Sequence, residues 1–425
     1  MNFRHAEHEG RVVKLAYCLN LHPAGDLAET LAGLRTVLLP LRERLAPGEP
    51  FGVGMYLPAK FARALASPRG ATDLEKLGHF LATHGLEPFT YNAFPSGGFH
   101  EDGLKAGVFK PTWKDGDRLK FTVSVARAAA QLALATKLSA PGAHLSISTH
   151  SGMFGASVKS PRDLDDCAQQ LARAVDELAR IEEATGVHTV LSLEPEPRAS
   201  SENCRELAHF LLRAQDVGLA VLEDEANRER EHARKLLQRH LGACVDGCHA
   251  AVEGETDPLA LLHAVVIGKL QYSNAIVVLN PRQNAAGVAA LLALDEPRYL
   301  HQVTGHGRNV MRATDLPELK KALQGDAQAA WLACDRWVCH FHVPVDLAAA
   351  GEGLTTTRAD SDRLLGHMLG DPKRWKTRDL HLEIETYTWD ILAGPARGEG
   401  ALVDGLEREY RHVMQRLESA GWRRA

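Results

Sequence analysis

Short apolar segments alternate along this chain with longer amphipathic ones. The short segments lie at residues 11–20, 50–57, 88–94, 143–149, 188–195, 242–249, 267–274, 337–344 and 379–389, and residues 299–303 form a weaker tenth. Each is apolar or alternates between apolar and polar positions, and each is bounded by Gly, Pro or polar residues. These features are typical of β-strands.

The segments between these strands have the length and periodicity of helices. Leucines recur at three- and four-residue spacing through residues 26–45. Residues 160–186 place Ser160 as N-cap, Pro161 at the first helical position and Gly186 just past the end. Residues 117–138, 200–218 and 401–421 have the same character. Regular alternation of strand and helix predicts a parallel sheet with crossover helices.

The number of these units predicts the fold class, an α/β barrel. Roughly eight strand–helix units fit a closed (β/α)8 TIM barrel better than an open sheet. A doubly wound open sheet is the competing fold, but no GxGxxG turn follows the first strand. Because the strand candidates outnumber the staves of such a barrel, we expect one domain over residues 11–425 with an insertion between the late strands, at residues 275–340.

Composition and charge narrow the classes of function. The net charge of −5 on 425 residues opposes binding to nucleic acid or to anionic membranes. The N-terminus lacks the apolar core of a signal peptide, and no apolar run is long enough to span a membrane, so we expect a cytoplasmic protein. The seven cysteines lack paired CxxC spacing, and we interpret most of them as small buried packing residues.

Polar side chains collect where the predicted strands end. In the active site of a barrel of parallel strands, the reacting groups lie at the carboxyl ends of the strands. The residues at these ends are Asn20, His22, Asn92, His100, Ser148, His150, Glu194, Glu196, Asp246, His249, Gln271, His340, His342, Glu383 and Glu385. A barrel core without a site would place Val, Ile and Leu there. The pattern therefore predicts a polar, metal-bearing cavity.

Strand alternation indicates which of these side chains point the same way. Glu383 and Glu385 share a face, and we prefer Glu385 as a ligand because it lies nearer the strand end. Glu194 and Glu196 share a face, as do His340 and His342. Asp246 and His249 stand three apart after an apolar run, a spacing that suits metal ligands and equally an ordinary strand end.

The residue types indicate the cofactor and the chemistry. Oxygen and imidazole ligands suit Mn²⁺, Mg²⁺, Co²⁺, Fe²⁺ or Zn²⁺ without choosing among them. Such an ion polarises the oxygens of a polyol, and two carboxylates that flank a sugar can move protons on opposite faces. Lys269 and Arg308 are candidates for binding a phosphate, with a salt bridge as the alternative. Trp113, Tyr387 and Trp389 are candidates for the floor of a sugar site, with core packing as the alternative.

Several ordered blocks resemble the signature blocks of one family. They are YCLNLHPAGD, FTYNAFPSGGFHEDGLKAGVFKPTW, LSLEPEP, CVDGCHAAVE, GKLQYSNA, HFHVPV and LEIETYTW. Their order, over about residues 15 to 415, is similar to that of the EboE family, metabolite-traffic proteins encoded in a biosynthetic operon. That family is similar in turn to the xylose isomerase-like TIM-barrel superfamily of sugar and sugar-phosphate isomerases and epimerases.

The resemblance implies roles for particular residues. Glu194, Asp246 and Glu385 would hold a divalent metal, Glu194 and Glu385 would also transfer protons, and His249 would contact substrate or metal. Where the superfamily usually has a His, this chain has Gln271. Either Gln271 is a neutral ligand, or His342 or His340 supplies the imidazole. The substrate-binding residues that we expect are His22, Asn92, His100, His150, His249, Lys269, His340 and Trp389.

These observations lead to one leading hypothesis and two alternatives. The leading hypothesis is a divalent-metal-dependent isomerase or epimerase that acts on a sugar, a cyclitol or their phosphates in a biosynthetic or metabolite-export pathway. The alternatives are a non-catalytic metabolite-binding protein, which Gln271 favours, and a metal-dependent hydrolase, whose nuclease form the net charge of −5 opposes. The expected partners are a small polyol or sugar, a second copy in a homodimer, and proteins of the same operon.

Overall fold

The computed structural model describes residues 1–98, 103–138, 142–392 and 399–425. Eight parallel strands form its centre: β2 Val12–Cys18, β3 Phe51–Tyr56, β4 Leu86–Asn92, β5 Leu145–His150, β6 Thr189–Glu194, β7 Leu241–Asp246, β8 Val266–Tyr272 and β15 Asp379–Ile384. They pair in chain order, and β15 also pairs with β2, from Asp379 opposite Val12 to Ile384 opposite Tyr17. This pairing closes the ring and confirms the predicted (β/α)8 barrel.

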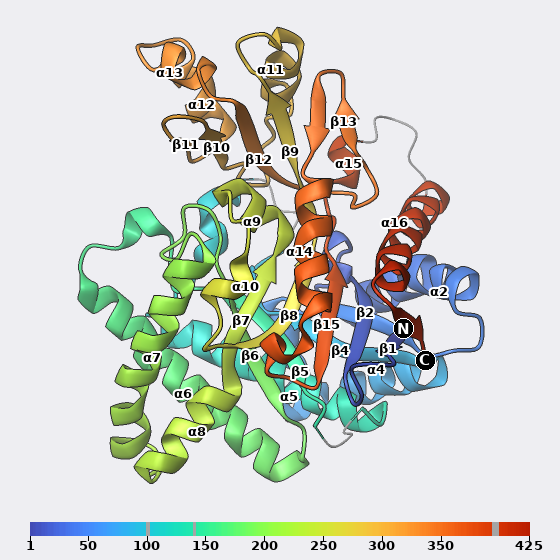
Figure 1. Ribbon diagram of the computed structural model, residues 1–425. Coiled ribbons are helices and arrows are strands. Elements are labelled where there is room, and N and C mark those ends of the chain that lie inside the picture. The colour runs from blue at the N-terminus through green and yellow to red at the C-terminus, as the bar shows by residue number, and fades with distance from the viewer. Residues whose placement is uncertain (99–102, 139–141, 393–398) are drawn as a thin grey trace.

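Helices alternate with the barrel strands (Figure 1). They are α1 Leu27–Gly33, α2 Leu39–Leu45, α3 Ala59–Leu65, α4 Ala71–Thr83, α5 Gly116–Ala135, α6 Pro161–Thr185, α7 Cys204–Asp224, α8 Arg230–His240, α9 Gly247–Glu253, α10 Pro258–Leu261, α14 Arg358–Gly370, α15 Trp389–Leu392 and α16 Glu399–Ser419. Helix α6 has the predicted ends: Asp163 accepts the backbone N–H of Ser160 at 2.8 Å, and Gly186 follows with φ of 72°. The segment predicted as one helix over 26–45 contains a π turn that joins α1 to α2.

A second, antiparallel sheet stands over the carboxyl ends of the barrel strands (Figure 1). We call it the small sheet; its strands are β9 Asn274–Leu279, β10 Val303–His306, β11 Met311–Ala313, β12 Arg336–Val343, β13 Ala349–Gly351 and β14 Leu354–Thr356. It carries helices α11 Ala285–Leu292, α12 Leu316–Ala322 and α13 Gln328–Leu332. The predicted strand 337–344 is β12 of this sheet, and of the weaker candidate 299–303 only Val303 belongs to a strand.

The small sheet is joined closely to the barrel. Only Ser273 separates β8, a barrel strand, from β9. The sheet has an apolar core of its own, which includes the buried side chains of Trp331 and Trp337. It extends from Asn274 to Thr356, around the interval 275–340 that the sequence predicts as an insertion.

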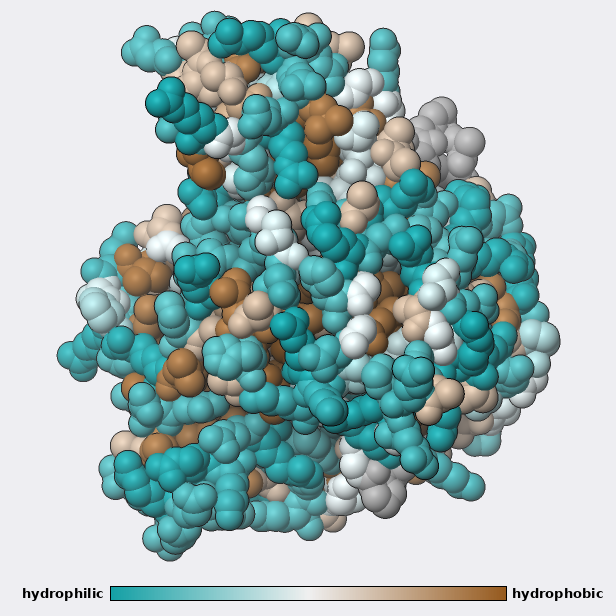
Figure 2. Space-filling view, in the orientation of Figure 1, coloured by the Kyte–Doolittle hydropathy of each residue, from teal (hydrophilic) through white to brown (hydrophobic). Residues whose placement is uncertain are grey.

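The two termini meet at the opposite end of the barrel. Strand β1, Asn2–His5, pairs antiparallel with β2 and with β16, Trp422–Arg424. On the face in Figure 2 polar residues predominate, and apolar residues appear in separate small groups. Within the described ranges no helix is both long and apolar enough to cross a membrane. All seven cysteines are buried and free of disulfides.

A buried carboxyl group ties α16 to the segments that follow β12 and β15. Glu409 accepts the backbone N–H of Val345 and the hydroxyl of Thr386, each at 2.9 Å, and its side chain is fully buried. Burial raises the pKa of Glu409 to about 8, whereas its ordinary value is 4.5. The folded protein therefore holds a proton on Glu409 at pH values where the unfolded chain has released it.

Replacing Glu409 with Gln should reduce the pH dependence of stability. Because the pKa of Glu409 is higher in the folded state, its contribution to the free energy of unfolding falls as pH rises between the two values, by up to about 1.4 kcal/mol per pH unit. Urea unfolding across this interval should show that the free energy of unfolding of Glu409→Gln rises relative to that of the wild type as pH rises. Glu407→Gln is the control, since ion pairs with Arg411 and Arg44 lower the pKa of Glu407. Equal pH dependence in wild type and Glu409→Gln would contradict the prediction.

Candidate active site

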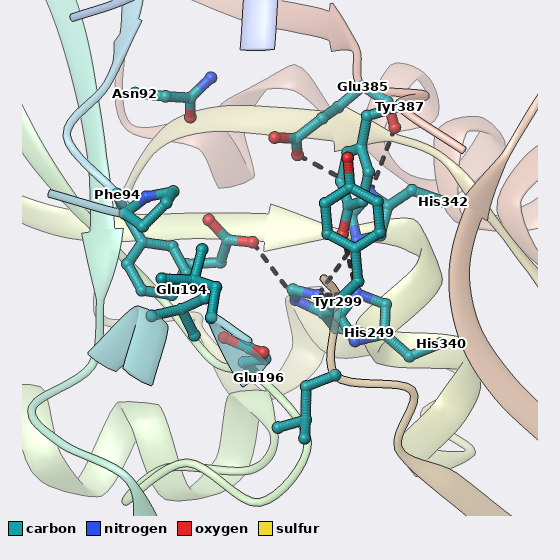
Figure 3. Close-up of a pocket in the computed structure, with 14 residues that line it drawn as sticks. Asn92, Phe94, Glu194, Glu196, His249, Tyr299, His340, His342, Glu385 and Tyr387 are labelled. Atoms are coloured by element: carbon teal, nitrogen blue, oxygen red, sulfur yellow. Dashed lines mark hydrogen bonds and ion pairs between the residues drawn. The ribbon is translucent and has the colours of Figure 1, made fainter. Parts of the chain in front are cut away.

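A small cavity lies between the carboxyl ends of the barrel strands and the small sheet (Figure 3). Its volume is about 60 Å³, which is room for an ion with a few water molecules. The residues suggested by the sequence that line it are Asn92, Glu194, Glu196, His249, His340, His342, Glu385 and Tyr387. In the view of Figure 3, the carboxylates of Glu194 and Glu385 lie between Asn92 and Phe94 on one side and the three histidines on the other.

Three buried acidic side chains converge here, and two of them, Glu194 and Glu385, line the cavity. Glu194 ends β6, Asp246 ends β7, and Glu385 follows β15 directly. One oxygen from each can be chosen so that all three lie within 4.8 Å of one another. We call these three side chains the carboxylate cup. The barrel brings them together because the carboxyl ends of parallel strands meet at one rim.

Neighbouring groups hold the carboxylate cup in place. Asn20 Nδ2 donates to Glu385 Oε1 at 2.7 Å. Asp246 caps α9 by accepting the backbone N–H of His249 at 2.8 Å, and the hydroxyl of Ser273 donates to Asp246 Oδ2 at 3.0 Å. Glu385 Oε2 is buried and has no hydrogen-bond partner among the residues that the structure describes. A buried carboxylate oxygen without a donor is a fitting ligand for a cation.

The electrostatics of the carboxylate cup favour a bound cation. Burial, and then the charges of Glu385 and Asp246, raise the pKa of Glu194 well above its usual range. Burial, and then Glu383 and Asp246, raise the pKa of Glu385 in the same way. The pKa values rise because ionised carboxylates repel one another out of contact with water. A divalent ion would remove this repulsion, so the residues fit such a cofactor.

An ion pair fills the barrel interior next to the carboxylate cup. Lys269 Nζ lies 2.5 Å from Glu383 Oε2, and both side chains are fully buried. Lys269 Nζ also donates to Asn92 Oδ1 at 3.1 Å. Burial opposes the charge on Lys269, but Glu383, Cys244, Cys18 and Glu385 together outweigh it and raise the pKa of Lys269. Lys269 is thus engaged by Glu383, and the other candidate phosphate ligand, Arg308, is exposed on the small sheet.

Three histidines form a cluster beside the carboxylate cup. His249 lies on α9, and His340 and His342 lie on β12 of the small sheet. His249 Nδ1 is 3.3 Å from Glu194 Oε1, and His249 Nε2 is 3.2 Å from the Nε2 atoms of both other histidines. Burial lowers the pKa of His342 to about 4 and that of His340 well below its usual value. The ring of Tyr387 stacks on that of His342, with the two ring centroids 4.6 Å apart.

Some of the site residues predicted from the sequence do not line the cavity. The amide of Gln271 accepts from Cys244 Sγ at 2.8 Å and donates to Asn92 Oδ1 at 3.3 Å. His150 is buried, with its ring near Phe94 and Phe109. His100 lies outside the described residues.

Two further candidates lie against packing partners. His22 Nε2 is 3.5 Å from the hydroxyl of Tyr17. The indole of Trp389 packs closely on Gly405 of α16, where a Cβ atom would lie 2.1 Å from the ring. The candidate floor residue Trp113 is also buried, and its Nε1 donates to Thr149.

The site also contains residues that the predicted ligand set leaves out. Gln302 Nε2 donates to Glu196 Oε1 at 3.0 Å, and Gln302 Oε1 lies 2.6 Å from His340 Nδ1. Gln302 therefore links Glu196, which lines the cavity, to the histidine cluster. Tyr299 lines the cavity as well. Glu196 shares a strand face with Glu194, which is a usable signal, whereas nothing in the sequence distinguishes Gln302.

No family model and no curated protein matches the chain. Among solved structures, it is similar to an L-ribulose 3-epimerase at 12% identity and a TM-score of 0.42, over 96% of this chain and 95% of that one. It is also similar to a xylose isomerase domain containing protein from Salmonella typhimurium LT2, at 10% identity and a TM-score of 0.40. That match covers 95% of this chain and 97% of the other. A third similar structure is the IolI protein with a bound zinc atom, at 13% identity and a TM-score of 0.34. That match covers 61% of this chain and 72% of the other. These low scores carry no conclusion about the reaction, and the barrel itself rests on the strand pairing.

Proposed function

We propose that the chain is a divalent-metal-dependent isomerase or epimerase that acts on a sugar, a cyclitol or their phosphates. The carboxylate cup carries this proposal, because it gathers three buried acidic groups with ligand oxygens within 4.8 Å. Glu194, Asp246 and Glu385 would hold the ion, and His342, whose Nδ1 is 3.9 Å from Glu385 Oε2, is the neighbouring imidazole. The EboE-like blocks support a place in a biosynthetic or metabolite-export pathway.

The two glutamates of the carboxylate cup supply the proton chemistry. When bound, the ion would polarise the hydroxyl and carbonyl oxygens of the substrate. Glu194 and Glu385 project from different strands into one cavity (Figure 3). One carboxylate takes the proton from the carbon next to a carbonyl group, and the other returns a proton to the opposite face.

Solvent deuterium tests the reaction directly. The metal-loaded chain is incubated in deuterated water with a panel of aldoses, ketoses, cyclitols and their phosphates. We expect one class to gain deuterium at a carbon and to yield an isomer, both followed by nuclear magnetic resonance. Product analysis also detects an isomer formed by internal hydride transfer, which brings in no deuterium. The control is Glu87→Gln, near the opposite end of the barrel on β4. The proposal would be overturned if no class of compound showed either deuterium exchange or an isomeric product.

A non-catalytic metabolite-binding protein is the second candidate. The observation that favours it is Gln271, a neutral amide already engaged by Cys244 and Asn92, where the resembling superfamily usually has a His. Calorimetric titration with the same panel separates the two candidates. Tight binding of one compound without deuterium exchange or product would support this second function.

A further inference from the structure

The histidine cluster has the geometry of a metal site in its own right. His249 Nε2 lies 3.2 Å from His340 Nε2 and 3.2 Å from His342 Nε2. The three ring centroids lie 4.6, 4.8 and 5.1 Å apart. Nitrogens that bind one tetrahedral zinc ion at about 2.0–2.1 Å stand about 3.3 Å from each other. Each of the two nitrogen–nitrogen distances thus matches one edge of a zinc coordination shell, and a carboxylate oxygen of Glu196 offers a third ligand atom within 4.8 Å of His249 and His340.

Hydrogen bonds fix which nitrogen of each ring carries hydrogen. His249 Nδ1 faces the carbonyl oxygen of Pro195 at 3.1 Å, and His342 Nδ1 faces that of Glu385 at 3.2 Å. A carbonyl oxygen only accepts, so both Nδ1 atoms donate. The neutral rings of His249 and His342 therefore present unprotonated Nε2 atoms to each other.

Gln302 fixes the third ring. His340 Nδ1 lies 2.6 Å from Gln302 Oε1. The amide of Gln302 is oriented by its own nitrogen, which donates to Glu196 Oε1 and to the carbonyl of Pro197, each at 3.0 Å. The Gln302 oxygen therefore accepts from His340, and His340 Nε2 also presents a lone pair. Metal-binding histidines donate the other ring N–H to an oxygen in this manner.

A proton alone does not satisfy this arrangement. One hydrogen on His249 Nε2 can be shared with His340 or with His342, but not with both. At least one contact of 3.2 Å would then join two lone pairs without a hydrogen between them. A cation between His249 Nε2 and His340 Nε2 turns their contact into two ligand bonds.

The backbone of β12 departs from regular geometry at this point. Its pairing with β9 shifts register between Cys339 and Val343. His342, inside that interval, has φ of 44°, in the left-handed region that residues other than Gly rarely adopt. Across this irregular stretch, the side chains of both His340 and His342 line the cavity.

We propose that His249 and His340, with a carboxylate oxygen of Glu196, form a second divalent cation site, rich in nitrogen and suited to Zn²⁺ or a similar late first-row ion, next to the oxygen-rich carboxylate cup. Imidazole ligands prefer such ions, whereas carboxylates suit Mg²⁺ and Mn²⁺ equally well. His342, whose Nε2 is 3.2 Å from His249 Nε2, lies beside this set and can complete the shell. The proposal does not depend on the reaction, because metal content is measured without substrate.

The number of bound ions tests the second site. The full chain is stripped with a chelator, dialysed against Zn²⁺ and assayed by mass spectrometry of the metal. We expect two equivalents in the wild type and one in His340→Gln. Glu385→Gln should also keep one, since it damages the carboxylate cup and spares the imidazoles. His306→Gln, a histidine of the small sheet that bonds to Val252, is the matched control and should keep two.

Spectroscopy of the wild type decides the question without relying on a variant that folds. X-ray absorption at the zinc edge should show scattering from imidazole rings, and Co²⁺ in place of zinc should give the intense visible bands of a tetrahedral, nitrogen-rich site. At most one equivalent of zinc with an all-oxygen shell would overturn the second site. A wild type and a His340→Gln variant that hold two equivalents with equal affinity would overturn it as well.

Discussion

Replacing Glu385 with Gln is expected to lower the affinity of the carboxylate cup for Mn²⁺ by about 100-fold or more and to abolish deuterium exchange. The variant removes one of three buried negative charges and one ligand oxygen, a larger change than the loss of a second-shell partner, which costs about 10–100-fold. Gln keeps an oxygen that can accept from Asn20, as Glu385 Oε1 does at 2.7 Å, so the local packing survives. Calorimetric titration of the stripped protein measures the affinity.

The same variant should be more stable than the wild type when both are free of metal. Repulsion within the carboxylate cup and burial raise the pKa of Glu385. Each buried, ionised carboxylate without a counter-ion destabilises the folded wild type, and the Gln substitution removes one such carboxylate. We therefore expect a higher melting temperature for stripped Glu385→Gln and a smaller gain on adding metal. A variant that melts lower than the wild type yet binds Mn²⁺ as tightly would contradict both expectations.

Replacing Lys269 with Met is expected to cost about 3–5 kcal/mol of stability, because it leaves Glu383 charged and unpaired inside the barrel. The two groups lie 2.5 Å apart with neither exposed to solvent. The double variant Lys269→Met with Glu383→Gln removes both charges and should recover most of the loss. Urea unfolding at neutral pH measures the three free energies.

The exposed pair Lys120 and Asp117 gives a matched comparison. Its atoms lie 3.2 Å apart, but both side chains are largely exposed. Lys120→Met should leave stability unchanged within error, since water screens such pairs. Equal losses from Lys269→Met and Lys120→Met, or a double variant as unstable as Lys269→Met, would show that the buried ion pair does not hold the barrel interior together.

Local pattern was sufficient to predict the barrel. Its eight strands coincide with sequence segments whose apolar residues and boundaries are set by neighbours in the chain. The strand 337–344 has the same local character but pairs antiparallel with β9 and β10. Nothing within its own residues distinguishes a barrel strand from a strand of the small sheet. That assignment depends on pairing between distant segments.

The candidate site divides in the same way. Glu194, Asp246 and Glu385 could be singled out because strand ends in a parallel barrel meet at one rim. The bond between Gln302 and His340 could not, because it depends on how two strands of the small sheet lie beside each other. The shared face of His340 and His342 followed from alternation, but their approach to His249 depends on where the small sheet stands.

The closure of β15 onto β2 determines when the site can form during folding. Asn20 and Glu385, which share a hydrogen bond, are separated by 365 positions in the chain. Contacts this distant in sequence form late, because a large loop must be ordered before they add stability. A ribosome must therefore release nearly the whole chain before the last barrel strand, β15, can complete the carboxylate cup. If the proposed function holds, metal uptake at the carboxylate cup follows the last step of barrel closure. A chain truncated before β15 would lack one of the three acids of the cup, however well its other strands had paired.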